Sequence, residues 1–419
     1  MRIVDALPPP ETGAGSADPA VVAEILRDVQ QRGDAALHDW TRKFDRRELE
    51  ALTVPPQLLR RAFAELDAAD RQALEHAARN IRAYAEAQLH SIQPFSLEIE
   101  PGVFAAQRIV PVDRAACYVP GGRYPLPSTV LMTVLPAVVA GVREVIVLSP
   151  PGPDGWPNRA ILAAAHLAGA TAVHPVGGVQ AIGAAAHGTH SIAACDLIVG
   201  PGNSWVTEAK RQVFGRVGID ALAGPSEVLV LLDRTADLAK VAADLLAQAE
   251  HDPDAHALAV TDDRSVAEAL CAEVQRQLET LPTKAVAAEA IARHGLVAVV
   301  RDRAAMVAAA NARAPEHLEI CTQQPEELAE KCTSYGGLFI GGEAAEVFGD
   351  YCVGPSHVLP TVGAGRYTGG LSVHTFLKVL SAQSARPGSV RGLARTAAHL
   401  ARMEGLEGHA RAAEQRLPK

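Results

Sequence analysis

A glutamine and a histidine stand three residues apart at the end of a predicted helix. Apolar residues recur at helical spacing from Asp237 to Glu250, and Pro253 ends the pattern just beyond Gln248 and His251. Side chains three apart on a helix project to the same side, so these two could share a metal ion. Glutamine is an unusual zinc ligand, and a histidine is favoured at a helix C-terminus by the helix dipole alone. Spacing by itself therefore favours a solvated helix end.

A second pair with chemical potential is Glu316-His317, which follows Ala314-Pro315 and precedes a predicted strand. Histidine titrates near neutrality, so a histidine beside a carboxylate in a loop is a candidate acid–base pair. Adjacent residues do not face each other on regular structure, so the two would act at different points. Taken alone, a loop histidine next to a solvated glutamate explains the pair more simply.

Two further polar segments lie towards the C-terminus. Residues 349–360 form a turn-rich stretch that holds Asp350 and His357, and polar, glycine-rich loops are where function concentrates. Glu404 and His409 stand in a charged helical tail, where surface charge is the simpler explanation of both. Neither segment on its own specifies a reaction.

Three glycine-rich turns each follow a predicted strand and carry a polar side chain: Tyr118, Gln180 and Asn203. The turns cover residues 118–123, 176–180 and 199–203. Glycine lets the backbone approach a ligand closely, and a helix N-terminus offers free N–H groups to an anion. In open α/β sheets the ligand crevice lies beyond the carboxyl ends of the strands. One such turn is explained as a tight connection, whereas three with polar side chains at comparable places favour a ligand site.

The composition is that of an ordinary globular protein. The chain has 419 residues, of which 48% are hydrophobic and 21% charged, and a formal net charge of −9. This charge argues against nucleic acid or an anionic membrane surface as the main partner, and no stretch approaches the roughly 20 consecutive apolar residues that span a bilayer. Six scattered cysteines without a CxxC pair fit a cytoplasmic location. A thiolate nucleophile at Cys117 or Cys352 has no recognisable activating context.

Alternating helices and strands carry these candidates. The first part of the chain predicts helices at 20–34 and 56–88, then β-branched alternation at 103–112. Helix-then-strand units follow, with strands at 145–148, 171–176 and 196–199. A second series has strands at 227–232, 257–261, 296–300, 318–321 and 337–340, with helices at 237–250, 265–281 and 303–313. Short strands that are apolar on both faces indicate parallel sheets covered by helices, so we expect two Rossmann-like domains.

The end of the chain and the missing motifs limit the choice of function. Residues 388–417 predict a helical tail that is too polar for a core of its own, so we expect it to pack on another surface, such as that of a partner subunit. No P-loop, GxSxG or HExxH motif occurs. The GxGxxG fingerprint is also missing, so assignment as a conventional dehydrogenase cannot depend on it.

Taken together, these segments closely resemble the histidinol dehydrogenases, the enzymes of the last two steps of histidine biosynthesis. The matching segments are 118–128 (YVPGGRYPLPS), 177–184 (GGVQAIGA), 200–220 (GPGNSWVTEAKRQVFGRVGID), 223–227 (AGPSE), 244–253 (DLLAQAEHDP), 314–320 (APEHLEI), 349–361 (GDY…HVLPT) and 404–409 (EGLEGH). They span most of the chain in the family's order. Their combination is specific, although no single segment is.

The resemblance implies a role for each candidate. It implies a zinc site of Gln248, His251, Asp350 and His409. It implies a catalytic pair, Glu316 and His317, and an NAD-contacting set, Tyr118, Gln180 and Asn203. The substrate-contacting set that it implies is Ser226, Gln248, His251, His317, Asp350, Glu404 and His409. In the family the last zinc ligand comes from the other subunit of a homodimer, which would explain the polar tail.

The implied reaction is the four-electron oxidation of L-histidinol to L-histidine through L-histidinal, with zinc and NAD as cofactors. Zinc would mainly orient the substrate through its imidazole and amine nitrogens. His317 would act as general base while hydride passes to NAD, and Glu316 would activate water to attack the aldehyde. A paralogous zinc- and NAD-dependent alcohol dehydrogenase of a sulfonated propanediol is the alternative, because it would keep the same metal and NAD positions. A zinc hydrolase or a non-catalytic NAD-binding subunit is disfavoured by the complete catalytic and ligand sets.

We therefore expect an α/β fold with two Rossmann-like parallel-sheet domains, one inserted in the other, and small helical segments at both ends, in an intertwined homodimer. The expected divisions are an N-terminal segment (1–19), a domain carrying the metal and catalytic residues (20–117 and 225–370), an inserted NAD-binding domain (118–224) and a C-terminal tail reaching the partner subunit (371–419).

Overall fold

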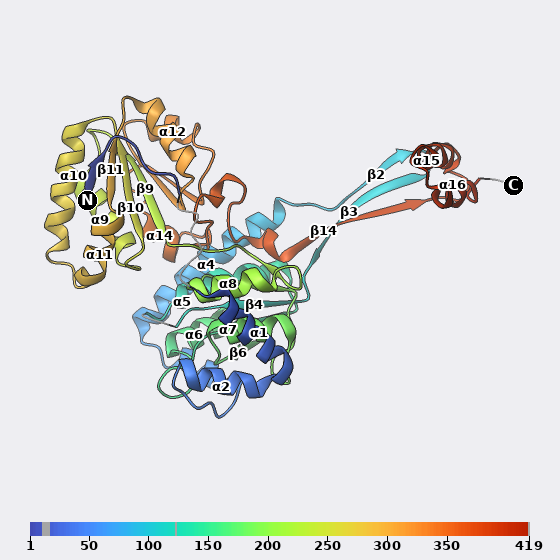
Figure 1. Ribbon diagram of the computed structural model, residues 1–419, viewed down its shortest axis with the longest axis horizontal. Coiled ribbons are helices and arrows are strands. Elements are labelled where there is room, and N and C mark those ends of the chain that lie inside the picture. The colour runs from blue at the N-terminus through green and yellow to red at the C-terminus, as the bar shows by residue number, and fades with distance from the viewer. Residues whose placement is uncertain (11–16, 122–123, 418–419) are drawn as a thin grey trace.

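The computed structural model describes residues 1–10, 17–121 and 124–417, arranged as two α/β units and one long arm (Figure 1). Residues 122–123 of the first glycine-rich turn and residues 11–16 of the N-terminal segment lie outside the described residues. No helix in the described part of the chain is both long and apolar enough to cross a membrane. The expected parallel-sheet α/β fold is confirmed.

One unit is built on a six-stranded parallel sheet of order β1-β11-β10-β9-β12-β13. Its strands are β1 (Arg2–Val4), β9 (Glu227–Leu232), β10 (His256–Thr261), β11 (Leu296–Val299), β12 (His317–Cys321) and β13 (Gly337–Ile340). Its helices are α9 (Leu238–Ala249), α10 (Arg264–Leu278), α11 (Lys284–His294), α12 (Arg303–Arg313), α13 (Pro325–Ala329) and α14 (Glu346–Tyr351). Every residue of β9 and β10 is buried, because both faces of the sheet are covered. Along β9, Val228 and Val230 pack with α9–α11, whereas Leu229 and Leu231 pack with α12 and α13.

The other unit is built on a five-stranded parallel sheet of order β6-β5-β4-β7-β8. Its strands are β4 (Arg114–Tyr118), β5 (Glu144–Leu148), β6 (Ala172–His174), β7 (Leu197–Val199) and β8 (Gly218–Ile219). Its covering helices are α5 (Pro127–Ala140), α6 (Arg159–Ala168), α7 (Gly178–His187) and α8 (Ser204–Val213). The direction of strand addition reverses between β4 and β7, so the crevice that binds ligands in such sheets lies beyond the ends of these two strands.

We expected the N-terminal helices to belong with residues 225–370. In the structure they pack on the five-stranded unit instead. They are α1 (Pro19–Arg32), α2 (Asp34–Phe44), α3 (Pro56–Ala64) and α4 (Ala68–His90). Leu26 and Val29 on α1 approach so closely to Gly183 on α7 that an added Cβ would meet them at 3.3 Å. β4 likewise lies in the five-stranded sheet, and β1 adds the 1–19 segment to the six-stranded one. An amphipathic stripe shows that a helix face is buried but does not specify the surface that buries it, which explains the difference.

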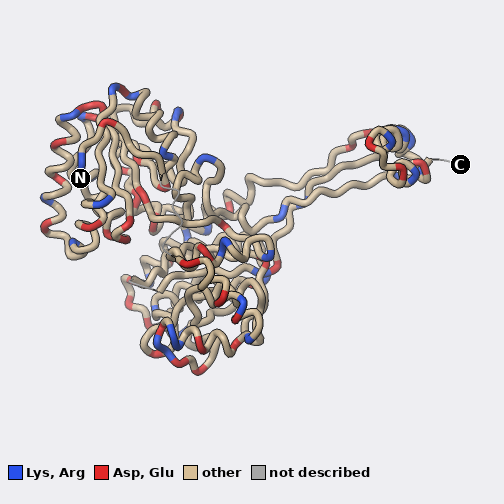
Figure 2. Tube along the Cα trace, viewed as in Figure 1, with Lys and Arg blue, Asp and Glu red and all other residues tan. Residues whose placement is uncertain are grey.

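The arm is a three-stranded antiparallel sheet that connects the body to two helices at its far end (Figure 1). Its strands are β2 (Phe95–Glu100), β3 (Val103–Pro111) and β14 (Leu377–Ala385), and the terminal helices are α15 (Arg391–Met403) and α16 (Glu407–Glu414). Two short 3-10 helices, η1 (Ala364–Arg366) and η2 (Val373–Phe376), precede β14. The helices pack together through Ala398, Ala401, Ala410 and Ala413. The predicted helical tail is confirmed by these two helices, and charges of both signs gather on them (Figure 2). The strand at 377–385 was not expected.

Candidate active site

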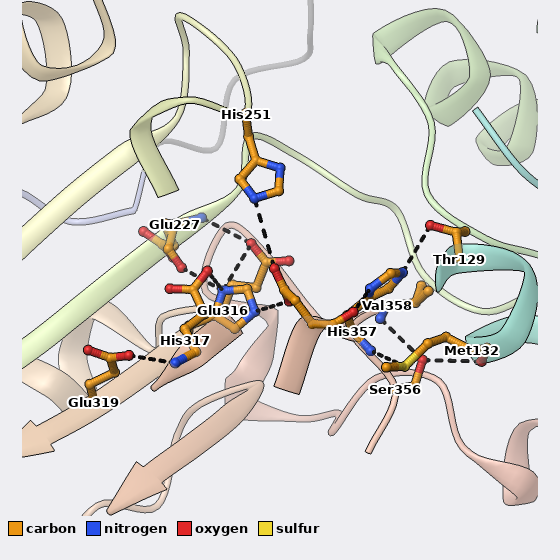
Figure 3. Close-up of polar contacts among 12 residues, drawn as sticks. Thr129, Met132, Glu227, His251, Glu316, His317, Glu319, Ser356, His357 and Val358 are labelled. Carbon is orange, nitrogen blue, oxygen red and sulfur yellow. Dashed lines mark hydrogen bonds and ion pairs between the residues drawn. The ribbon is translucent and has the colours of Figure 1, made fainter. Parts of the chain in front are cut away.

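The catalytic candidates lie at the amino end of β12, inside the six-stranded unit. His317 is the first residue of β12, Glu316 precedes it, and the neighbouring strand begins at Glu227 (Figure 3). All three side chains are buried. Ligands of open α/β sheets ordinarily bind beyond the carboxyl ends of the strands. Here the polar cluster occupies the opposite edge.

Both members of the pair bond to the backbone of Glu227. The Glu227 N–H donates to Glu316 Oε2 at 3.0 Å, and His317 Nδ1 donates to the Glu227 carbonyl oxygen at 3.2 Å. With Nδ1 as donor, the other ring nitrogen, Nε2, is left to accept a proton. Nε2 has no hydrogen-bond partner among the described residues and lies 3.6 Å from Asp350 Oδ1. The imidazole is therefore oriented with its basic nitrogen towards Asp350.

Asp350, near the end of α14, stands between two histidines. Its Oδ2 lies 3.9 Å from His251 Nε2, and its Oδ1 faces His317. Gln248 is completely buried at the end of α9, and neither atom of its amide has a hydrogen-bond partner in the described part of the chain. A buried amide oxygen without a donor, a carboxylate and an imidazole are oxygen and nitrogen donors of the kind that zinc accepts. The local donor set thus fits a metal ion.

Glu346 is a further buried carboxylate at this edge. Its Oε1 lies 3.4 Å from His317 Nδ1, and Glu346, His317 and Asp350 offer ligand atoms within 4.8 Å of one another. This group shares Asp350 with the predicted zinc set. We did not expect Glu346 from the sequence, although its spacing of four residues from Asp350 on a short helix places both on one face.

Burial and charge act together on these groups. Burial alone would lower the pKa of His317, but the carboxyl groups of Glu346, Glu316 and Asp350 outweigh it and raise the pKa well above its usual value. Burial raises the pKa of Glu316 to about 7, against the opposing effect of His317. Burial also opposes ionisation of Asp350, yet its interaction with the His317 ring holds its pKa below the ordinary range. By contrast, burial raises the pKa of the Cys117 thiol to about 12, which argues against a thiolate there.

The predicted NAD residues lie at the carboxyl edge of the five-stranded sheet. Tyr118 ends β4, and its hydroxyl accepts a hydrogen bond from the Gly178 N–H at 3.1 Å. Asn203 caps α8 by accepting from the Val206 N–H at 3.1 Å. Gln180 is buried, and its Oε1 has no hydrogen-bond partner among the described residues. All three surround the point where strand order reverses, so the residues fit a dinucleotide.

One histidine bridges the two units. His357 Nδ1 bonds to the backbone carbonyl of Asp350 at 2.9 Å, and its Nε2 lies 3.0 Å from the Thr129 hydroxyl on α5 (Figure 3). The His357 N–H also donates to the sulfur of Met132 on α5. The two predicted sites are thereby linked through a single side chain.

The remaining predicted residues are Ser226, next to Glu227, and Glu404 and His409 in the tail. Ser226 immediately precedes β9, and its carbonyl accepts from the His256 N–H at 2.9 Å. Glu404 and His409 are exposed at the far end of the arm, away from the other site residues of the same chain (Figure 1). Within one chain the structure therefore brings together Gln248, His251, Asp350, Glu316 and His317, but not Glu404 or His409.

The comparisons with known proteins agree on one family. The family model for histidinol dehydrogenase matches residues 12–417. The chain belongs to the histidinol dehydrogenase family. It is 44% identical over 398 residues to a histidinol dehydrogenase of Geobacillus kaustophilus, covering 95% of this chain and 93% of that one. It is 46% identical to that of Thermus thermophilus, covering 96% of each.

A solved structure of the same family extends this agreement to the fold. The crystal structure of the histidinol dehydrogenase from Elizabethkingia anophelis matches with a TM-score of 0.94 at 34% identity, covering 99% of this chain and 98% of that one. The suspected family is thus confirmed, and the protein is an oxidoreductase of the histidinol dehydrogenase family.

Proposed function

We propose that the protein oxidises L-histidinol to L-histidine through L-histidinal, in two successive transfers of hydride to NAD. The observation that carries the proposal is the buried pair Glu316–His317 facing Asp350, together with the buried Gln248 amide, which has no hydrogen-bond partner among the residues that the structure describes. Family membership supports the substrate, because the relatives named above are histidinol dehydrogenases. The alternative, oxidation of a sulfonated propanediol, has no such support.

We assign a zinc site to Gln248, His251 and Asp350, completed by His409 from a second copy of the chain. When bound, the metal supplies ligation of the substrate's imidazole and amine and thus fixes its position. The fit rests on the buried Gln248 amide without partners and on the facing carboxylate and imidazole. Ser226 and Glu404 are assigned to contacts with the substrate.

His317 acts as the general base in the first step. Its Nε2 takes the proton of the substrate hydroxyl as hydride leaves for NAD, and its Nδ1–H stays bonded to the Glu227 carbonyl. The neighbouring carboxyl groups favour the imidazolium that forms, and a cation bound at Asp350 would offset them and keep the ring neutral until it takes the proton. Burial excludes bulk water from the histidinal intermediate, which protects it from side reactions.

Glu316 acts in the second step. One of its carboxylate oxygens is held by the Glu227 N–H, so the other is left to take a proton from the water that attacks the aldehyde. A second NAD then takes hydride, which gives the acid. The cofactor is assigned to Tyr118, Gln180 and Asn203, at the carboxyl edge of the five-stranded sheet.

A homodimer follows from the position of His409, since the zinc site of one chain needs a tail from another. The arm also presents Phe95, Leu97 and Ile99 on one face of β2, each more than half exposed, as a surface that a second copy would cover. We assign the enzyme to the cytoplasm, without nucleic acid or a membrane as partner, on its net charge and scattered cysteines. All six cysteines are free.

The test is NADH formation by the zinc-loaded protein with L-histidinol, and with dihydroxypropanesulfonate in parallel. Two NADH per histidinol consumed is the expected result. Turnover of the sulfonate without turnover of histidinol would overturn the assigned substrate.

A further inference from the structure

A buried arginine lies directly behind the catalytic pair. Arg313 is the last residue of α12, three residues before Glu316, and only 4% of its surface is exposed. Its Nε and Nη2 both donate to Glu227 Oε2, at 2.8 and 2.7 Å. The ion pair between these two side chains is enclosed by protein on all sides, with 3% of each exposed.

The remaining donors of Arg313 reach two other segments. Nη1 donates to the carbonyl oxygens of Pro8 and Pro9, each at 3.1 Å, and Nη2 lies 3.1 Å from Nδ1 of His256. Burial and the charge of Arg313 lower the pKa of His256 to about 4, so its ring is neutral and Nδ1 accepts. A guanidinium has five N–H donors, and here every one has an acceptor.

Glu227 connects this arginine to the reacting groups. Its side chain is held by Arg313, and its two backbone groups are bonded to Glu316 and His317, as described above. The position of one residue therefore determines the orientation of both catalytic side chains. A buried ion pair gives little net stability, because desolvation offsets the attraction, but it does restrict geometry.

We propose that Arg313 and Glu227 are positioning residues for the catalytic pair: their ion pair fixes the first residue of β9, whose N–H orients the Glu316 carboxylate and whose carbonyl orients the His317 imidazole. The proposal rests on the function proposed above. Neither side chain touches substrate or cofactor in this role, and both act through Glu316 and His317.

The decisive experiment separates the effect of the ion pair on the orientation of Glu316 and His317 from its effect on the stability of the fold. Arg313→Met leaves the Glu227 carboxylate buried without its partner, so both the melting temperature and kcat are expected to fall. The double variant Arg313→Met, Glu227→Met removes both charges but keeps the backbone N–H and carbonyl of residue 227. Its melting temperature is expected to recover, because apolar pairs replace buried ion pairs at little cost. Its kcat is expected to stay about 100-fold below wild type, the scale of a misplaced catalytic group.

Binding measurements complete the prediction. The KM values for NAD and histidinol and the zinc content are expected to stay near those of wild type, because no ligand contact is lost. Arg313→Lys, which retains the charge but not the contacts to Pro8, Pro9 and His256, is expected to recover part of kcat. A double variant that regains kcat together with its melting temperature would overturn the proposal.

The chain offers a matched control at the other end of the same helix. Arg303 begins α12 and pairs with Asp233 just after β9, and it donates to the Gln323 carbonyl just after β12. Arg303 therefore connects the carboxyl ends of β9 and β12, whereas Glu227 and His317 lie at the amino ends of these two strands. Arg303→Met is expected to lower the melting temperature while leaving kcat unchanged. An equal loss of kcat in this variant would show a general effect of destabilisation and contradict the proposal.

A spectroscopic measurement keeps the inference independent of turnover. In protein labelled with ¹⁵N-histidine, the His317 ring resonances are expected to move in the double variant and to stay in place in Arg303→Met. Wild-type protein that does not oxidise histidinol would count against the proposed function alone. Unmoved His317 resonances in the double variant would count against the positioning role, whatever the substrate.

Discussion

Thr129 and Asp350 belong to different α/β units, yet the ring of His357 joins them, with one nitrogen on the Thr129 hydroxyl and the other on the Asp350 carbonyl. The backbone that carries a proposed zinc ligand is thus bonded to the helix that follows β4, the strand that ends at Tyr118. The segment that holds Asp350 is thereby bonded to the unit that carries the residues proposed to bind NAD.

Replacing His357 with alanine is expected to weaken zinc binding by about tenfold or more, because residues that support a ligand affect affinity on this scale. Competition with a chelator measures the change. Thr129→Val is the comparison, since it removes the hydroxyl but leaves the ring's bond to Asp350 and the backbone bond to Met132, and its zinc affinity is expected to fall less than that of His357→Ala. Equal zinc affinity in His357→Ala and wild type would contradict the prediction.

The proposed sharing of the site between two chains predicts complementation. Mixed dimers of His409→Ala and His317→Asn chains contain one site with an intact body and an intact tail. Random reassociation of equal amounts is therefore expected to restore about a quarter of wild-type activity, although each variant alone is inactive. A mixture of His409→Ala with Glu404→Ala is the control. Both changes lie on the tail, so every site carries one of them and no recovery is expected.

A second buried ion pair supports the NAD turn. Lys210 Nζ donates to the Gly200 carbonyl at 3.0 Å and pairs with Asp220, whose Oδ2 accepts from the Gly200 N–H at 2.7 Å. Gly200 has φ +110°, and a Cβ there would lie 2.1 Å from the Tyr118 carbonyl oxygen.

Lys210→Met is therefore expected to weaken NAD binding at least tenfold and to reduce stability by about 3 kcal/mol, the cost of leaving a buried charge unpaired. Titration with NAD and unfolding by urea measure the two effects. The zinc content is expected to remain unchanged, since Gln248, His251 and Asp350 lie in the other unit and His409 in the tail. Wild-type NAD affinity in the variant would show that the turn does not depend on this pair.

A buried carboxyl pair predicts how stability depends on pH. Burial raises the pKa of Asp244 to about 6, and burial together with the charge of Asp244 raises the pKa of Glu319 to about 8. Both folded-state values exceed the unfolded ones, so the stability they contribute is fully present below about pH 4, falls as the pH rises, and is lost by about pH 8.

The melting temperature of the wild type is thus expected to fall between pH 6 and pH 9, and Glu319→Gln is expected to make that fall smaller, with the remainder due to Glu316 and His317. Thermal unfolding of both proteins at the two pH values checks the prediction. Glu279→Gln, a change at an exposed glutamate, serves as the control and is expected to keep the wild-type fall. A steep fall retained in Glu319→Gln would contradict the assignment.

The sequence predicted individual elements and residue pairs better than their arrangement. The spacing of Gln248 and His251 placed both at the end of α9, and the apolar runs predicted most strands of both sheets, but not β1 or β8. Glu346, Glu227 and Arg313 were not expected. A buried charge has no periodic signal in the sequence, since its role depends on partners that are distant in the chain.

Two features needed the tertiary structure. The stripe of α1 predicted a buried face, but only the close contact at Gly183 shows that this face packs on α7. The strand β14 pairs with β3 across nine positions from Leu377 to Ala385, far along the chain, and isolated strand propensity does not specify such a partner. The tail alone suggested packing on another surface, and the arm shows how far from its own body His409 is carried.

The edge of the sheet at which a ligand binds also decides the sign of the partial charge that the helix ends present to it. In a parallel α/β unit the covering helices end at the amino edge of the strands, where their free carbonyl groups carry partial negative charge. Gln248 and Asp350 stand at such ends, on α9 and α14. Asn203 and Gly178 stand instead at helix beginnings, where free N–H groups carry partial positive charge. Cationic ligands therefore suit one edge and anionic ligands the other, so the helix ends by themselves favour the proposed zinc ion at one edge and the proposed NAD pyrophosphate at the other.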